Sequence, residues 1–300
     1  METITRIKQL KQERNALIMA HNYVEAPLQE VADFVGDSLE LSRKAANLSA
    51  PVIVLVGVHF MAETCKIMSP ASRVFVPAPD AGCPMADMAP AQDVAAYRQA
   101  HPGTVLVAYV NTTAATKAEV DICCTSSNAE QIVASIPADR EIMFLPDRNL
   151  GANIAAKLGR KMNLWPGCCP VHDKITAAQV AALRQDHPGA VLMMHPECRP
   201  EVIAHADLAL STGKMLSAAK EVQQDILVGT ETGIIHRLKV ENPGKAFFPL
   251  QPEPICPDMK KNTLEKLLSC LENLSGEVLL SDDICRRARL PIERMLAGHL

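Results

Sequence analysis

Amphipathic segments alternate with short apolar runs along this chain, and the same order of segments occurs three times. Each repeat opens on a segment with helical spacing, and these helices are expected at 4–15, 91–103 and 177–189. The second and third of them end in His-Pro-Gly, which stops a helix. An apolar run with the length of a buried strand follows each helix, at 16–20, 104–108 and 190–194.

The remainder of each repeat predicts one more helix and two more strands. Hydroxyl or Asx residues precede the expected helices at 39–48, 129–136 and 214–222. Apolar runs predict strands at 52–58, 141–146 and 225–229, and shorter strands at 73–79, 162–167 and 246–252. After the third repeat, 259–274 predicts a helix like those that open the repeats, and the tail through Pro291 is expected to be helical.

Three Cys-Pro steps mark the period of this repeat. They are Cys83-Pro84, Cys169-Pro170 and Cys256-Pro257, at intervals of 86 and 87 residues. A period this long indicates one folding unit used three times. We therefore predict an α/β fold of three αβα domains with parallel sheets, related by a pseudo-threefold axis. The expected domains are 1–83, with a tail 257–300 that packs back on it, then 84–169 and 170–256.

Polar residues occur in the same register as the cysteines. The clusters His21-Asn22-Tyr23, Tyr109-Val110-Asn111 and His195-Pro196-Glu197 each close the first apolar run of a repeat. Alternate residues of a strand share a face, and open α/β sheets bind ligands at the carboxyl ends of their strands. Ser38, Ser126 and Thr212 lie just before these helices, whose exposed first amides favour a carboxylate or a phosphate. Taken singly, each would be an ordinary helix cap; in register, the three indicate anion binding.

Composition narrows the class of protein. A net charge of −4 and the lack of basic clusters give no sign of nucleic-acid or membrane binding. The amino terminus lacks the apolar core of a signal peptide, and no apolar run has the length of a membrane span. We therefore expect a cytoplasmic protein, in which the 10 cysteines serve a metal or catalysis rather than disulfides.

One cysteine from each repeat could bring three thiolates to a common axis. Zinc commonly takes four ligands and closely paired Cys-x-x-Cys spacings, which this chain lacks. Thiolates also hold iron–sulfur clusters, and a cubane with three cysteine ligands leaves one iron open to act as a Lewis acid. The alternative is that the cysteines are small buried hydrophobic residues. Only the period of the repeat favours Cys169 over its neighbour Cys168.

Longer strings in the chain resemble one enzyme family. They are MAHNYVEAPLQEVADFVGDSLELS, DAGCPMADM, VAYVNTTAATKAEVDICCTSSNA, WPGCCPVH, MMHPECRPEV, STGKM, TETGIIHRL and ICPDMKKNTLEKL, which together span 15–273. These strings resemble quinolinate synthase, the A protein of NAD biosynthesis. Some members carry a Cys-x-x-Cys before the third cluster ligand; here Pro-Glu-Pro-Ile precedes Cys256, so no disulfide regulation through that motif is expected.

The resemblance implies a fold, a reaction and a set of residues. It implies three domains around one [4Fe-4S] cluster held by Cys83, Cys169 and Cys256. It implies a transferase that condenses iminoaspartate with dihydroxyacetone phosphate, releasing quinolinate, phosphate and two waters, and a partner enzyme that oxidises aspartate. The substrate-binding positions it implies are His21, Tyr23, Ser38, Tyr109, Asn111, Ser126, His195, Glu197 and Thr212, with Val110 and Pro196 inside the same clusters and Tyr23 at the phosphate end.

The chemistry suggests roles for these residues. Glu197 is expected to be the general base, with Tyr23 and Tyr109 as proton donors or shuttles. His195 and His21 would hold a carboxylate or carbonyl oxygen, whereas Glu231 and His236 are weaker candidates. Two other functions stay open: an aconitase-type hydro-lyase, which would also use an open iron, and a non-catalytic iron–sulfur redox sensor. The sensor would usually need an effector domain such as a basic DNA-reading helix, and the sequence shows none.

Overall fold

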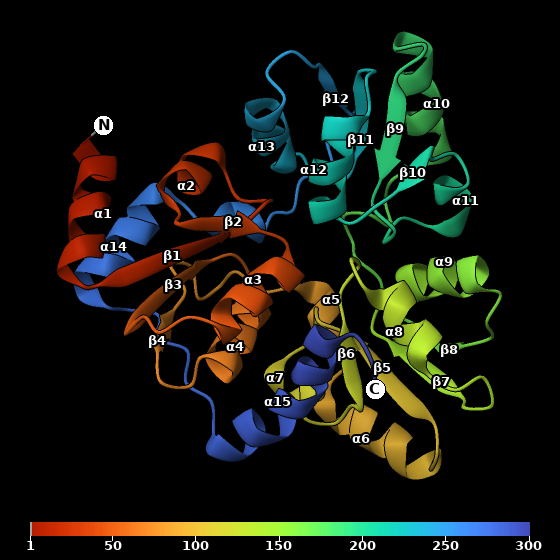
Figure 1. Ribbon diagram of the computed structural model, residues 1–300, viewed down its shortest axis with the longest axis horizontal. Helices are drawn as coiled ribbons and strands as arrows, with labels where there is room; N and C mark the ends of the chain where they lie inside the picture. The colour runs from red at the N-terminus through yellow and green to blue at the C-terminus, as the bar shows by residue number, and fades with distance from the viewer. Residues whose placement is uncertain (1) are drawn as a thin grey trace.

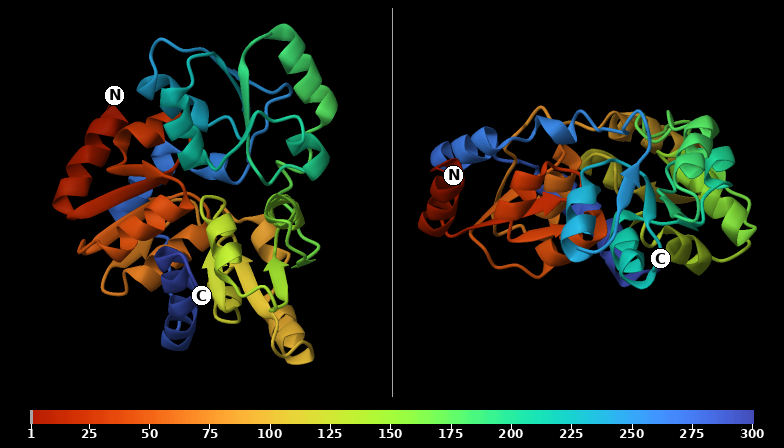
Figure 2. Two further views of the ribbon diagram at one scale, coloured as in Figure 1. Left: turned by 45° about the vertical axis from the view of Figure 1, so that its right-hand side comes forward. Right: turned by 90° about the horizontal axis from the view of Figure 1, so that it is seen from above.

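The fold consists of three small parallel sheets, each flanked by helices, arranged around a common centre (Figures 1 and 2). A computed structural model describes residues 2–300. The strand orders are β2-β1-β3-β4, β6-β5-β7-β8 and β10-β9-β11-β12, so the three sheets have the same topology. Every neighbouring pair of strands within them is parallel. The predicted α/β class with three similar domains is confirmed.

The first unit carries the most regular elements. In chain order they are α1 (Glu2–Glu13), β1 (Ala16–His21), α2 (Ala26–Val31), β2 (Phe34–Gly36), α3 (Ser38–Ala46), β3 (Val52–Val56), α4 (His59–Met68) and β4 (Arg73–Phe75). Strands β1 and β3 form the centre of the sheet and are almost entirely buried. They are apolar because helices cover both faces of a parallel sheet.

The other two units repeat this order. The second contains α5 (Pro84–Asp87), α6 (Ala91–Ala100), β5 (Val105–Tyr109), α7 (Ala114–Lys117), β6 (Ile122–Cys124), α8 (Ala129–Ser135), β7 (Ile142–Leu145), α9 (Arg148–Leu158) and β8 (Asn163–Leu164). The third contains α10 (Ala177–Asp186), β9 (Val191–Met194), α11 (Pro200–Ile203), β10 (Leu208–Ala209), α12 (Thr212–Glu221), β11 (Ile226–Gly229), α13 (Ile234–Glu241) and β12 (Phe247–Pro249).

The sequence patterns located three strands of each sheet and missed the fourth. The missed strands β2, β6 and β10 have only two or three residues, too few to show any periodicity. The helix predicted over 259–274 is also wrong in its first part. Met259–Lys261 is a short 3₁₀ turn, Asn262 has an extended backbone, and α14 (Leu264–Asn273) begins only where the Thr263 hydroxyl accepts the Lys266 N–H.

The tail holds two of the units together. Helix α14 packs against α1 of the first unit, and α15 (Asp282–Ala297) contacts α4 of the first unit as well as α7 and β6 of the second (Figure 1). The exact domain boundaries stay a prediction. Within residues 2–300, no helix has the length and apolar character that crossing a bilayer requires.

Each sheet is braced in the same way at the amino end of its central strand. In the second unit, Asp121 accepts the Leu106 N–H at 2.8 Å and pairs with Arg98 at 3.1 Å. The same pattern joins Asp33 to Ile18 and Lys11 in the first unit, and Asp207 to Leu192 and Arg184 in the third. The repeat therefore extends to a structural ion pair on the side opposite the polar strand ends.

This brace should contribute measurably to stability. We expect Asp121→Ala to lower the free energy of unfolding by about 1–3 kcal/mol, because the Leu106 amide loses its acceptor. Thermal denaturation followed by circular dichroism measures the change. Asp139→Ala, at an exposed position, is the control and should melt with the wild type. Equal melting temperatures for Asp121→Ala and the wild type would show that the brace is dispensable.

Candidate active site and metal centre

A cavity lies where the carboxyl ends of the three sheets meet. It encloses about 890 Å³ not filled by protein atoms, including its open mouth. Thirteen of the candidate site residues named from the sequence line it: His21, Tyr23, Ser38, Cys83, Tyr109, Asn111, Ser126, Cys169, His195, Glu197, Thr212, Glu231 and Cys256. The three units thus contribute to one site. Its size suits a small-molecule ligand or a cofactor.

Two of the expected substrate-binding residues do not line this cavity. The Val110 side chain faces a smaller adjoining cavity instead. The Pro196 carbonyl accepts a hydrogen bond from the Asn153 amide at 2.8 Å, outside the cavity lining. Both residues lie between two lining residues, so the alternation of side chains along an extended segment explains their placement.

Two of the units end their first strand in the same turn. In the first, the Tyr23 N–H donates to Nδ1 of His21 at 3.2 Å. In the third, the Glu197 N–H donates to Nδ1 of His195 at 3.4 Å. A neutral imidazole that accepts at Nδ1 carries its proton on Nε2. The Nε2 atom of His195 lies 3.2 Å from the Ser126 hydroxyl, so the third unit is joined to the second across the cavity.

The three helix starts meet next to one another. Ser38 begins α3 and Thr212 begins α12, and their caps are the preceding residues Asp37 and Ser211. Ser127 donates to the Asp37 carboxylate at 2.6 Å and lies 2.7 Å from the Ser211 hydroxyl. One residue from each unit therefore forms a hydrogen-bonded group beside the cavity. Among the residues that line the cavity as the structure describes it, no lysine or arginine occurs, so hydroxyls, imidazoles and backbone amides would have to receive an anion.

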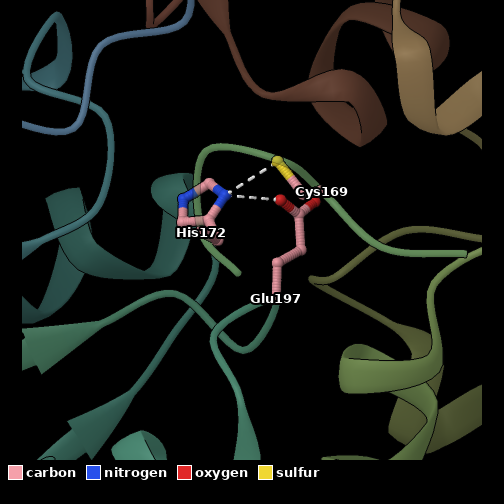
Figure 3. Close-up of side chains that lie close together, drawn as sticks. All are labelled: Cys169, His172 and Glu197. Carbon is pink, nitrogen blue, oxygen red and sulfur yellow. Dashed lines mark hydrogen bonds and ion pairs between the residues drawn. The ribbon is translucent and has the colours of Figure 1, made fainter. Parts of the chain in front are cut away.

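Glu197 lies at the centre of a hydrogen-bonded chain. Its Oε1 accepts from the Tyr109 hydroxyl at 2.5 Å, and its Oε2 lies 2.7 Å from Nδ1 of His172. The same Nδ1 is 3.2 Å from Sγ of Cys169 (Figure 3). All three side chains of Figure 3 belong to the cavity wall.

The chain continues on the far side of His172. Its Nε2 lies 2.9 Å from the Thr230 hydroxyl, which is 2.5 Å from the Tyr23 hydroxyl. Both tyrosines of the site are therefore connected through Glu197, His172 and Thr230. Neither His172 nor Thr230 was identified from the sequence. The Cys169-Pro-Val-His172 spacing, typical of metal ligands, was a signal that could have revealed the histidine.

The cavity wall alters the acidity of its groups. Burial alone would raise the pKa of the Glu197 carboxyl, but the adjacent imidazoles and the hydrogen bond from Tyr109 outweigh it and hold that pKa well below its usual range. Burial lowers the pKa of His21 and of His195 to about 4, so both imidazoles are neutral near pH 7. Burial and the Glu197 charge raise the pKa of Tyr23 and Tyr109 well above 10.

The thiols of the three Cys-Pro steps are protonated without a metal. Burial raises the pKa of the Cys83 thiol to about 12. Burial and the Glu197 charge raise the pKa of Cys169 well above its usual value. Cys168 does not line the cavity, and its backbone N–H contacts the Met88 sulfur. Of the two adjacent cysteines, the structure therefore directs Cys169 to the site.

A second group could also hold a metal ion. One ligand atom each from Cys169, His172 and Glu197 lie within 4.8 Å of one another. In this arrangement the His172 Nδ1 already contacts both the carboxylate and the sulfur. The group is therefore satisfied by its own hydrogen bonds. Three separate thiols, one from each unit, remain the better donor set for a larger thiolate-bound centre.

These features define a class of protein: a three-unit α/β protein with a buried, thiol-bearing site of the kind found in metal-dependent enzymes. A family model described as quinolinate synthetase A protein matches residues 5–297. The chain belongs to this family.

Curated relatives cover nearly the whole chain. A protein of Dehalococcoides mccartyi named quinolinate synthase is 49% identical over 292 residues, covering 97% of this chain and 96% of the relative. A protein of Methanosarcina acetivorans named quinolinate synthase 2 is 46% identical, over 97% of this chain and 94% of its own. One of Geobacter metallireducens named quinolinate synthase is 45% identical, over 97% and 96%.

The neutral histidines predict a pH dependence of stability for the metal-free protein. The unfolded chain protonates His21 near its ordinary pKa of 6.5, but the folded protein only near 4, so acid favours unfolding in this window. We expect the melting temperature to fall as the pH is lowered from about 7 to about 5. His21→Gln should flatten this slope, whereas His299→Gln, at an exposed position, should not. A slope unchanged in His21→Gln would contradict the lowered pKa of this imidazole.

Proposed function

We propose that this chain is a quinolinate synthase that condenses iminoaspartate with dihydroxyacetone phosphate to give quinolinate, phosphate and two waters in NAD biosynthesis. The family and the names of its relatives support this reaction. The observation that carries it is the meeting of three thiols and three polar strand ends, one of each per unit, in a single cavity. Two substrates with several anionic groups need such a site, which has polar residues on several walls.

Cys83, Cys169 and Cys256 are the proposed ligands of a [4Fe-4S] cluster. Their donor set fits the group, because all three line the cavity at the same point of each repeat. Their raised pKa values mean that assembly must release protons from the thiols. When bound, a cluster with three cysteine ligands supplies a Lewis-acidic iron for removing hydroxide from a substrate.

The residues around the cluster site bind the anionic groups of the substrates. Neutral His195 donates from Nε2, which lies 3.2 Å from the Ser126 hydroxyl. Ser38 and Thr212 line the cavity at the starts of α3 and α12 and present their hydroxyls, since Asp37 and Ser211 already bind the amides of the following residues. His21 and Asn111 complete the wall, and the Asn111 Oδ1 is buried without a partner, ready to accept from a ligand. The carboxylates and the phosphate are received by these donors.

Proton transfer is assigned to the hydrogen-bonded chain around Glu197. The carboxylate is ionised and accepts from Tyr109, so it orients this hydroxyl toward the substrate and takes up a proton through it. On the other side, His172 and Thr230 connect the same carboxylate to the Tyr23 hydroxyl. Tyr23 and Tyr109 are therefore the proton donors at two ends of the cavity, with Glu197 as the base between them.

A reconstituted reaction tests this function and separates it from the alternatives. Aspartate, an aspartate-oxidising enzyme and dihydroxyacetone phosphate are mixed anaerobically with the protein, and quinolinate is measured. Formation of quinolinate excludes a hydro-lyase with one substrate and a redox sensor without turnover. Absence of quinolinate from iron-loaded protein would overturn the proposal.

The assignment of the ligands predicts which cysteines matter. Replacement of Cys83, Cys169 or Cys256 by Ser should abolish the cluster and quinolinate formation, because each thiolate is one of three ligands. Cys168→Ser should keep both, since this thiol does not line the cavity. Iron and sulfide analysis with the absorption spectrum gives the result. A Cys168→Ser protein without iron, beside an iron-loaded Cys169→Ser protein, would place the ligand one residue earlier.

The division between proton transfer and anion binding predicts two kinetic classes. Glu197→Gln should remove turnover and keep cluster and substrate binding, because the amide has the shape of the carboxylate without its basicity. Ser38→Ala or Thr212→Ala should chiefly weaken binding, by about 1–2 kcal/mol for a hydrogen bond to a charged group. Steady-state kinetics separates the losses in kcat and KM. Normal turnover by Glu197→Gln would move the base to a tyrosine.

A further inference from the structure

The segment after each Cys-Pro step packs against the unit that follows that cysteine in the chain. After Cys83, the Met88 carbonyl accepts from the Trp165 indole of the second unit at 2.7 Å. After Cys169, the His172 ring contacts Thr230 of the third unit. After Cys256, the segment returns to the first unit, so the three connections form a cycle. The contacts that hold the segment after Cys256 in place have no role in the mechanism described above.

Glu231 holds the backbone of the third ligand. Its side chain is fully buried and follows strand β11, two residues beyond Gly229. Its Oε1 accepts from the Cys256 N–H at 3.3 Å and lies 2.8 Å from Nζ of Lys260. Its Oε2 accepts from the Gly233 N–H at 2.7 Å. The carboxylate therefore has a donor at each oxygen, and one of these donors is the amide of a proposed cluster ligand.

Lys260 connects the same carboxylate to the strand end that carries Tyr23. Its Nζ donates to the Tyr23 carbonyl at 2.7 Å, from a side chain that is 19% exposed. The backbone at Gly233 also packs closely against Tyr23, since a Cβ atom added to Gly233 would lie 2.5 Å from the Tyr23 carbonyl oxygen. Nearby, Asn262 donates to the Gly57 carbonyl of the first unit at 3.0 Å. The ion pair between Glu231 and Lys260 is thus one of the contacts that join the first and third units.

We propose that Glu231 and Lys260 are positioning residues that hold the Cys256 thiolate and the Tyr23 hydroxyl at the active site. The proposal rests on the proposed function, because it takes Cys256 as a cluster ligand. Neither side chain has to touch the reacting atoms. Glu231 acts through the amide of Cys256, and Lys260 acts through the carbonyl of Tyr23.

The chemistry of the pair explains why it would matter. A hydrogen bond to the backbone of a metal ligand fixes the direction in which the ligand atom points, and losing such a partner typically costs about 10–100-fold in metal affinity or activity. Burying a carboxylate requires a counter-charge, which Lys260 provides. A neutral side chain at position 231 could accept from the Cys256 amide, but it would bind the Lys260 ammonium group less strongly.

The test uses the rate of iron release from anaerobically prepared holoprotein to an iron chelator. Glu231→Gln keeps the size of the side chain, but its NH₂ group must face a donor, either at Gly233 or at Cys256 and Lys260. We expect iron release to be about 10–100-fold faster and the electron paramagnetic resonance spectrum of the reduced cluster to change. Glu25→Gln is the matched control: its carboxylate also approaches Lys260, at 3.6 Å, but is exposed, and the variant should behave as the wild type.

A second variant and a second control separate positioning from general destabilisation. Lys260→Met should lower kcat more than it raises KM, because the Tyr23 hydroxyl is displaced while the anion-binding residues stay in place. Asp121→Ala loosens a sheet on the side away from the cavity and should release iron at the wild-type rate. Folding of every variant is checked by circular dichroism at the temperature of the assay.

Each possible result either supports or overturns the proposed role of Glu231 and Lys260. Iron release from folded Glu231→Gln at the wild-type rate overturns the proposal, as does equally fast release from Asp121→Ala. If Glu231→Gln does not fold, Lys260→Met decides through its kcat and its iron release, and wild-type values for both overturn the proposal. Wild-type protein without iron would instead overturn the proposed cluster itself, so the two failures are distinguishable.

Discussion

Three parallel sheets can build one site only if their carboxyl edges face the same axis. Each sheet has a single edge at which its strands deliver polar side chains, and β1, β5 and β9 deliver theirs into the same cavity. Hydrogen bonds from Ser127 to Asp37 and Ser211, one residue from each unit, lie beside the cavity. The carboxyl-terminal helix α15 contacts both the first and the second unit, and its Ala288, Ile292 and Met295 are buried. The site is therefore a property of the assembled chain, and no single unit contains it.

Burial of so many polar groups is tolerated because they satisfy one another. Glu197 is almost fully buried, yet it accepts from Tyr109 and contacts His172, which contacts Thr230 in turn. Neutral histidines at the other walls avoid the larger penalty for a buried cation. Neutral groups are thus available as donors for anionic ligands, and the three thiols are protonated, so binding of a metal would have to release their protons.

The fold class could be predicted from the sequence because Cys-Pro steps and polar clusters recur with the same period as the apolar runs. The period linked Cys83 to Cys169 and Cys256, and parallel-sheet geometry then grouped the strand ends correctly. Contacts between residues far apart in the chain could not be predicted: His172 and Thr230 are 58 residues apart, and nothing in a one-dimensional pattern connects them. Strands of two or three residues, such as β10, were missed because pairing with a neighbour, rather than their own pattern, defines them.

The central claim is that one thiolate from each unit holds a single cluster in the cavity. A crystal structure of anaerobically prepared protein, with iron located by anomalous scattering, tests it most directly. We expect one iron–sulfur cluster bonded to the sulfurs of Cys83, Cys169 and Cys256, with one iron facing the histidines and Glu197. Iron bound instead by Cys169, His172 and Glu197, with Cys83 and Cys256 free, would contradict the account.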